Sequence, residues 1–182
     1  MITALDLLIF QWFNSWAGVS FFWDWAILFC ATYLLYIVVA AILLIFVLTF
    51  LPRFRNYWDQ NKELVIVALV SAFVSRFVVT EIIRYFYNRP RPFEIVEGAR
   101  KLMAHPLGSS FPSGHAALAF AVAATVSFYY PKSSILFFLA AIFIGIGRVS
   151  AGIHWPSDIL GGALVGVGTA YVLSRFRPHR EG

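Results

Sequence analysis

Three short stretches of the 182-residue sequence combine residue types that could bind and transfer a phosphoryl group. The first contains Arg84, Arg89 and Arg91, and the prolines at positions 90 and 92 end any helix that reaches them. Guanidinium groups match phosphate oxygens bidentately, so this stretch could hold a phosphate. Alone, it could equally be a basic flank that anchors a helix among lipid headgroups.

The second stretch, Pro112-Ser113-Gly114-His115, leads directly into an apolar run. A turn of this kind at a helix start directs free backbone N–H groups and the positive end of the helix dipole at one point, which is a natural site for an anion. Ser113 could instead be only an N-cap, and His115 could lie at the membrane interface without a catalytic role.

The third stretch ends an apolar run at Arg148 and places His154 and Asp158 four residues apart across the next helix start. At this spacing the carboxylate can accept a hydrogen bond from one imidazole nitrogen and leave the other free, as in pairs that activate nucleophiles. Asp158 is the only acid in the three stretches, so we expect no metal ion or other cofactor. Two histidines then indicate a nucleophile and a general acid inside a positive shell.

The elements that must position these residues are membrane helices. The chain is 60% apolar and 13% charged, with a mean hydropathy of +0.78, whereas a soluble domain is about 45–50% apolar and about 25% charged. The net charge of +5 does not indicate nucleic acid binding, because the basic residues lie at the ends of apolar runs or among them. Cys30 is the single cysteine, which excludes an intrachain disulfide and a cysteine-based zinc site.

Five apolar segments are long enough for membrane helices. We expect them at residues 25–51, 63–85, 113–130, 133–150 and 156–175. Residues 1–22 contain Asp6, Gln11 and Asn14, and we interpret them as an interfacial helix, with a sixth span as the alternative. The predicted fold is therefore all-α, a single domain over residues 1–182 that forms an integral membrane bundle of five or six transmembrane helices.

Two further features concern the packing of this bundle. Gly162 and Gly166 have the small-xxx-small spacing that lets membrane helices approach closely, and we interpret them as packing residues. Arg76 interrupts the second span, and the sequence shows no clear partner for its charge.

The basic residues at span ends predict which way the protein faces. One set comprises Arg53, Arg55, Lys62, Lys132, Arg175, Arg177 and Arg180. The set at the other ends comprises Arg84, Arg89, Arg91, Arg100, Lys101 and Arg148. Arg84, Arg91 and Arg148 are discounted because their positions would be set by chemistry and not by membrane insertion. The first set then has seven basic residues and the second has three, so we expect the first set to be cytoplasmic. All three stretches and the long loop 86–112 would then face outward.

Together the three stretches resemble the motifs of the type-2 phosphatidic acid phosphatase family, the membrane relatives of vanadium haloperoxidases. That family's pattern is Lys, six residues, Arg-Pro; then Pro-Ser-Gly-His; then Ser-Arg, five residues, His, three residues, Asp. The resemblance covers residues 84–158, with Arg84 in place of Lys and Gly147 in place of Ser. We expect Gly147 to lose a hydroxyl that could bind a phosphate oxygen, with Ser150 or the backbone as compensation.

The resemblance implies a role for each motif residue. His154 would attack phosphorus and become a phosphohistidine, Asp158 would orient it, and His115 would protonate the leaving oxygen. The residues that would hold the phosphoryl oxygens are Arg84, Arg91, Ser113, Gly114 and Arg148.

The same resemblance implies a lipid phosphate in the bilayer as the substrate. The small size, the basic cytoplasmic ends and the outward site are most similar to bacterial undecaprenyl diphosphate phosphatases, which implies a role in cell wall biogenesis. Phosphatidylglycerophosphate and phosphatidate phosphatases share the motifs and are the alternative. An anion or phosphate transporter is the alternative of another class, but transport predicts contacts near the bilayer midplane and related halves.

Overall fold

The computed structural model describes residues 2–176, and every regular element in this part of the chain is a helix. Four helical segments are long and apolar enough to cross a membrane, namely Phe21–Leu48, Pro52–Phe86, Pro131–Ser150 and Pro156–Ser174. A fifth apolar helix, Gly114–Tyr129, is shorter. The expected all-α membrane bundle is confirmed, and the chain is a multi-pass membrane protein. Arg177 and Arg180, which contributed to the predicted orientation, lie outside the described residues.

The first span contains a π-helical turn. Its α2 (Phe21–Leu28) begins at Ser20, whose side chain accepts a hydrogen bond from the backbone N–H of Trp23, and its α3 (Leu34–Leu48) follows the π-helical η1 (Phe29–Tyr33). A π-helical turn bonds residue i to residue i+5, so it changes which side chains share a face.

The second span also contains a π-helical turn. Here η3 (Val74–Val79) joins α4 (Trp58–Phe73) to α5 (Thr80–Phe86), and the 3-10 turn η2 (Pro52–Tyr57) precedes α4. The helical segment thus begins well before residue 63, the predicted start, because the polar residues that open α4 continue the same helix. The cis-peptide bond in the following loop joins Phe111 to Pro112.

The last three long helices begin at strong helix-start signals. In α7 (Gly114–Tyr129) the cap is Ser113, whereas α8 (Pro131–Ser150) and α9 (Pro156–Ser174) each begin with a proline. Proline suits the first helical position because its missing N–H would have no intrahelical partner there.

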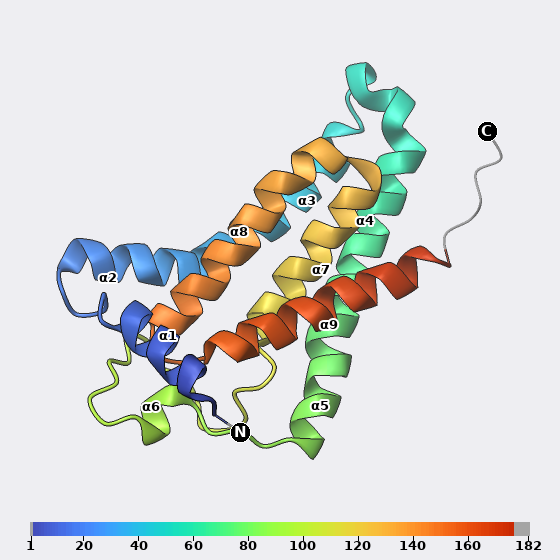
Figure 1. Ribbon diagram of the computed structural model, residues 1–182. Coiled ribbons are helices and arrows are strands. Elements are labelled where there is room, and N and C mark those ends of the chain that lie inside the picture. The colour runs from blue at the N-terminus through green and yellow to red at the C-terminus, as the bar shows by residue number, and fades with distance from the viewer. Residues whose placement is uncertain (1, 177–182) are drawn as a thin grey trace.

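The centre of the bundle is α7, which packs against α4, α8 and α9 (Figure 1). Small residues permit this packing: a Cβ atom at Gly162 would lie 2.5 Å from the backbone oxygen of Ser113, and one at Gly166 would overlap the backbone oxygen of Ala117. A Cβ atom at Gly168 would meet nothing within 4 Å. The prediction that Gly162 and Gly166 serve helix packing is confirmed.

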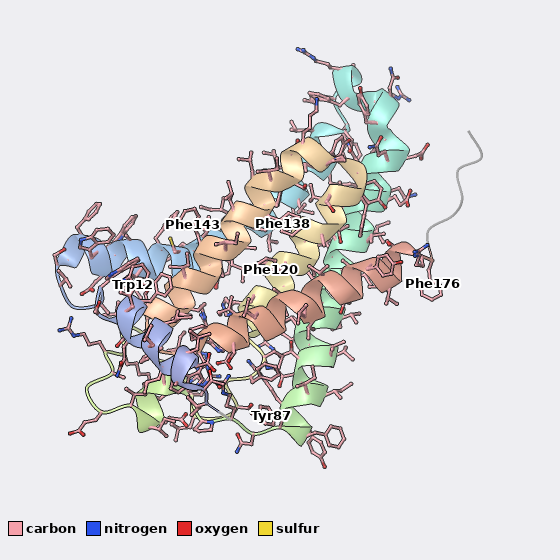
Figure 2. All side chains as sticks on the ribbon, viewed as in Figure 1. Trp12, Tyr87, Phe120, Phe138, Phe143 and Phe176 are labelled. Carbon is pink, nitrogen blue, oxygen red and sulfur yellow. The ribbon has the colours of Figure 1, made fainter. Side chains whose placement is uncertain are left out.

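The outer surface along the bundle is hydrocarbon, as a lipid-facing surface requires. Figure 2 shows side chains of carbon along the long helices, with Phe138 and Phe143 labelled on α8. The Phe143 side chain is 51% exposed, and Leu164 on α9 is 76% exposed.

The N-terminal segment forms α1 (Ala4–Asn14), which lies at the same end of the bundle as α6 (Pro92–Ile95) and the start of α9 (Figure 1). Its 11 residues extend about 16 Å, which is too short to cross a hydrocarbon core of about 30 Å. This length favours the interfacial helix over a sixth span.

Candidate active site

The three motifs meet at one end of the bundle. Figure 1 shows the end of α5, the start of α7, the end of α8 and the start of α9 at the same end, together with the connecting loop that contains α6. A backbone hydrogen bond of 2.9 Å from the N–H of Ser113 to the carbonyl oxygen of Asp158 joins the second motif to the third. Residues as far apart as 84 and 158 therefore form one site.

The predicted pair of His154 and Asp158 is present. The His154 Nδ1 atom lies 3.3 Å from Oδ2 of Asp158, and both side chains are buried. The same carboxylate oxygen accepts a hydrogen bond of 2.8 Å from the backbone N–H of Trp155, which holds it at the helix start. The other imidazole nitrogen, Nε2, lies 3.5 Å from Nη1 of Arg91. This geometry directs Nε2 toward the arginines that would hold a phosphoryl group.

The charge state of His154 suits a nucleophile. Burial lowers the pKa of His154 well below its ordinary value of 6.5, and the neighbouring charges of Arg148 and Arg91 lower this pKa further. The imidazole is therefore neutral at neutral pH, and a neutral imidazole has a lone pair available for attack.

The guanidinium groups of Arg84, Arg91 and Arg148 are fixed by backbone oxygens. Arg84 donates to Pro112 at 2.9 Å, Arg91 donates to Ile153 at 2.8 Å and to Ser109 at 3.0 Å, and Arg148 donates to Ala31 at 3.3 Å. Donors that are fixed before substrate arrives need no reorganisation during the reaction.

Each of these three guanidinium groups also has a buried Nε atom that no acceptor within residues 2–176 satisfies. An unsatisfied buried donor costs about 1–3 kcal/mol, and more when it is charged. Burial together with the neighbouring Arg84 lowers the pKa of Arg91 to about 10, so Arg91 still carries its proton at neutral pH. The arrangement fits an anion with several acceptor oxygens.

The second motif places His115 in the first turn of α7. Its Nε2 atom lies 3.4 Å from Nη1 of Arg148, and the side chain is partly exposed. Ser113 acts as the N-cap, with its hydroxyl accepting from the N–H of Ala116 at 3.5 Å. The cap interpretation is confirmed, while phosphate contacts by Ser113 and the Gly114 amide stay predictions.

Two residues, Arg89 of the first stretch and Asp6, complete the site in roles that the sequence did not reveal. Arg89 is buried and donates to Oδ1 of Asp158 at 2.5 Å and to Oδ2 of Asp6 at 2.7 Å. Asp6 also accepts from the backbone N–H and the hydroxyl of Ser157, at 2.9 Å and 2.7 Å. The only sequence signal for this role of Asp6 was that it is the one acid in a mostly apolar helix.

The electrostatics of Asp6 agree with this network. Burial alone would raise the pKa of Asp6, but the hydrogen bonds from Ser157 and the Arg89 guanidinium outweigh burial and lower it. Asp6 is therefore ionised, and its negative charge contacts one terminal nitrogen of the Arg89 guanidinium while Asp158 contacts the other. The interfacial helix α1 thus contributes to the site indirectly, through Arg89.

The structure supplies the partner of Arg76 that the sequence did not reveal. Nη1 of Arg76 lies 2.6 Å from Oε1 of Glu81, and the same oxygen lies 3.1 Å from Nη1 of Arg84. Residues five apart do not share a face of a regular α-helix, but Arg76 lies within the π-helical turn η3, whose i-to-i+5 bonding brings it and Glu81 together.

The expected role of position 147 is wrong. A Cβ atom at Gly147 would lie 2.6 Å from the backbone nitrogen of Ala31 and 2.9 Å from Cβ of Cys30. This position therefore faces η1 of the first span, and a serine there would collide with that turn. Gly147 permits close helix packing, and Ser150, the suggested compensation, is buried within α8.

A pocket of about 480 Å³ opens beside the arginines. Its lining residues are Arg76, Glu81, Arg84, Tyr85, Asn88, Arg91 and His105–Ser109. The His105 ring centroid lies 6.2 Å from that of His154, and burial lowers the pKa of His105 to about 4, which makes it neutral. The long loop thus forms one wall of the pocket with residues that sequence analysis did not select.

The chain belongs to the PAP2 superfamily, whose family model matches residues 64–181. This match contains all three motifs. It agrees with the family resemblance drawn from the motifs.

The curated proteins that are similar to the chain include one named as a transport permease protein and one named as a diphosphatase. It is 32% identical over 115 residues to the bacitracin transport permease protein BcrC of Bacillus licheniformis, covering 61% of this chain and 56% of that protein. It is 36% identical over 101 residues to an undecaprenyl-diphosphatase of Sulfolobus acidocaldarius, covering 55% and 49%. The matches thus span about half the length of these curated relatives.

A solved structure resembles nearly the whole chain. The crystal structure of Aquifex aeolicus LpxE superposes with a TM-score of 0.74 at 26% sequence identity and covers 96% of this chain and 97% of that one. The similarity therefore extends beyond the three motifs to α1 and the first span.

Proposed function

We propose that this protein is a membrane lipid phosphatase that removes the terminal phosphate of an isoprenoid diphosphate, with undecaprenyl diphosphate as its substrate. The observation that carries the proposal is the buried pair of His154 and Asp158 with the free imidazole nitrogen directed at fixed arginines. The relatives named undecaprenyl-diphosphatase support the choice of substrate.

In the first step, the terminal phosphoryl group binds to the guanidinium groups of Arg84, Arg91 and Arg148 with help from Ser113 and the Gly114 amide. The His154 Nε2 lone pair attacks phosphorus, and the bond from phosphorus to the bridging oxygen breaks. His115 gives a proton to the oxygen that leaves with the lipid monophosphate. The arginines stabilise the negative charge on the transferring group.

In the second step, water hydrolyses the phosphohistidine. His115, now neutral, accepts a proton from the water, whose oxygen attacks phosphorus and releases inorganic phosphate from His154. Asp158 holds the imidazole in one orientation throughout and stabilises the positive charge that the ring acquires. Arg89 and Asp6 hold Asp158 in turn.

The arrangement of the charges favours catalysis over transport. Transport would need substrate contacts near the bilayer midplane between related halves. In the described part of the chain, the motif residues lie at one end of the bundle, and their site forms without two related halves.

The direct test is to trap the phosphoenzyme. Purified protein mixed with undecaprenyl diphosphate labelled on its terminal phosphate should acquire an acid-labile label, and the His154→Ala variant should acquire none and lose turnover. His115→Ala should accumulate label slowly, since it lacks the acid and base. Turnover near the wild-type rate in His154→Ala would contradict this mechanism.

The substrate is tested by comparing kcat/KM for undecaprenyl diphosphate, phosphatidylglycerophosphate and phosphatidate under the same conditions. We expect the highest value for the isoprenoid diphosphate. A clear preference for a glycerolipid phosphate would retain the phosphatase and replace the proposed substrate.

We also propose that the active site faces the outside of the membrane, because the larger basic set lies at the opposite ends of the spans. With Cys30 first changed to Ala, a membrane-impermeant maleimide applied to intact cells should label Glu97→Cys and not Ser133→Cys, since both positions are exposed and lie at opposite ends. The reverse labelling would place the site in the cytoplasm.

A further inference from the structure

Arg76 lies at the active site although it belongs to none of the three motifs. A Cβ atom at Gly114 would lie 2.8 Å from Cζ of Arg76, so the guanidinium rests against the first residue of α7. Arg76 also lines the pocket that Arg84 and Arg91 line. A charged side chain within a membrane span is expensive and marks a functional position by default.

The π-helical turn and Glu81 together hold Arg76 in this position. Glu81 Oε1 contacts Nη1 of both Arg76 and Arg84, at 2.6 Å and 3.1 Å, so one carboxylate joins the two arginines. Only this polar contact of Arg76 is present within residues 2–176, and the side chain is 25% exposed. Its remaining donors are therefore available to a ligand in the pocket.

The position of Arg76 along its helix separates it from the motif arginines. It precedes Arg84 by eight residues, which corresponds to about 12 Å of rise along the span. Arg76 therefore approaches the site from the hydrocarbon side, next to the exposed ring of Phe77. A lipid whose terminal phosphate occupies the motif arginines must leave the site in the same direction, because its chain lies in the bilayer.

The charges around the pocket exceed what one phosphate requires. Arg76, Arg84 and Arg91 line the pocket with Glu81, and Arg148 interacts electrostatically with all three arginines. These four positive charges and one negative charge give a net charge of +3, while the charge of Arg89 is already balanced by Asp6 and Asp158. A phosphate monoester carries about −1.5 to −2 at pH 7, and a second phosphate adds about one more negative charge. The pocket, at about 480 Å³, falls within the usual size of ligand sites.

Resting on the proposed function, we propose that Arg76 binds the second phosphate of a lipid diphosphate, the phosphate that stays on the lipid. Arg84, Arg91 and Arg148 hold the terminal phosphoryl group that His154 attacks, and Arg76 holds its neighbour on the bilayer side. Arg76 is then a specificity-determining residue, because a lipid monophosphate leaves it without a ligand and paired only with Glu81.

The test compares two substrates that share one chain, undecaprenyl diphosphate and undecaprenyl phosphate. Arg76→Gln should lower kcat/KM for the diphosphate about 10- to 100-fold, the range expected for loss of a charge-assisted hydrogen bond. It should change kcat/KM for the monophosphate by no more than about 2-fold. Arg84→Gln, which removes a contact to the transferred group, should lower both values to a similar extent.

Two controls separate this effect from damage to the fold. Arg76→Met also removes the guanidinium, and Glu81 keeps Arg84 as its partner in both Arg76 variants, so Arg76→Met should show the same loss of selectivity. Arg53→Gln, an exposed arginine at the opposite end of the same helical segment, should leave both values unchanged.

The outcomes are distinct. Loss of selectivity in both Arg76 variants supports the inference. Equal losses of kcat/KM for the two substrates would overturn the inference and leave the phosphatase proposal intact. A wild-type enzyme without preference for the diphosphate would have the same consequence. Failure of the wild-type enzyme to hydrolyse either lipid would overturn the proposed function and this inference with it.

Discussion

The network around Arg89 predicts that changing Asp6 to Asn damages both stability and catalysis, although Asp6 contacts no substrate. The side chains of Asp6 and Arg89 are 5% and 4% exposed and lie 2.7 Å apart. Removing one partner of a buried ion pair costs about 3–5 kcal/mol. Because Arg89 keeps Asp158 as a partner, we expect Asp6→Asn to lower the free energy of unfolding by about 3 kcal/mol, the lower end of this range.

This loss should be visible in two measurements. At this chain length, about 3 kcal/mol lowers the thermal midpoint by about 6–12 °C, which can be followed in detergent. Without Asp6 to hold its other side, Arg89 shifts relative to Asp158, and a misplacement of this kind can lower turnover about 10- to 100-fold. We expect kcat to fall while KM changes little, since Arg84, Arg91 and Arg148 keep their backbone partners.

The matched control is Glu97→Gln, an exposed acid on the same end of the molecule, which should change stability by no more than about 0.5 kcal/mol. Activity is measured well below the midpoint of each variant, so that unfolding does not contribute. If Asp6→Asn keeps the wild-type kcat and midpoint, Asp6 does not hold the catalytic carboxylate through Arg89, and the reasoning fails.

Three further predictions concern chemistry and packing. The site consists of guanidinium and imidazole groups and of one carboxylate, which Arg89 already binds. EDTA should therefore leave activity unchanged, and vanadate should inhibit the enzyme. A loss of activity on chelation that magnesium restores would require another mechanism. Burial, and then the charges of Arg148 and Arg91, lower the pKa of His154, so His154 is protonated only at low pH. The acid limb of the pH profile of kcat/KM should therefore lie below pH 6.5, and in Arg91→Gln it should move up toward pH 6.5. An acid limb that does not move would belong to another group. Gly166→Ala should destabilise the protein by about 1–3 kcal/mol through overlap with α7, whereas Gly168→Ala should not, and equal thermal midpoints would refute the packing argument.

The parts of the site that depend on local sequence could be predicted. His154 and Asp158 lie four residues apart at a helix start, so their contact follows from the geometry of one turn. The cap at Ser113 follows in the same way. The apolar runs also predicted the spans, because a bilayer requires long stretches without charge.

The parts that depend on tertiary packing could not be predicted. Asp6 and Arg89 are 83 residues apart, and no periodicity relates them. The pairing of Arg76 with Glu81 needs a π-helical turn, which a search for α-helical spacing misses. The direction that Gly147 faces depends on which helix packs against it. The family pattern alone suggested that this position faces the phosphate, whereas in the structure it faces Ala31.

The contact between α1 and α9 has a consequence for biogenesis. Asp6 and Ser157 are 151 residues apart, and at about 5–20 residues per second a ribosome needs about 8–30 s to make the chain between them. Until then α1 lacks its partner on α9, and the carboxylate of Asp158 does not yet exist. His154 is made two residues before α9 begins, so a nascent chain that stalls before the third motif contains Arg84, Arg89 and Arg91 but lacks both His154 and Asp158, on which the proposed reaction depends.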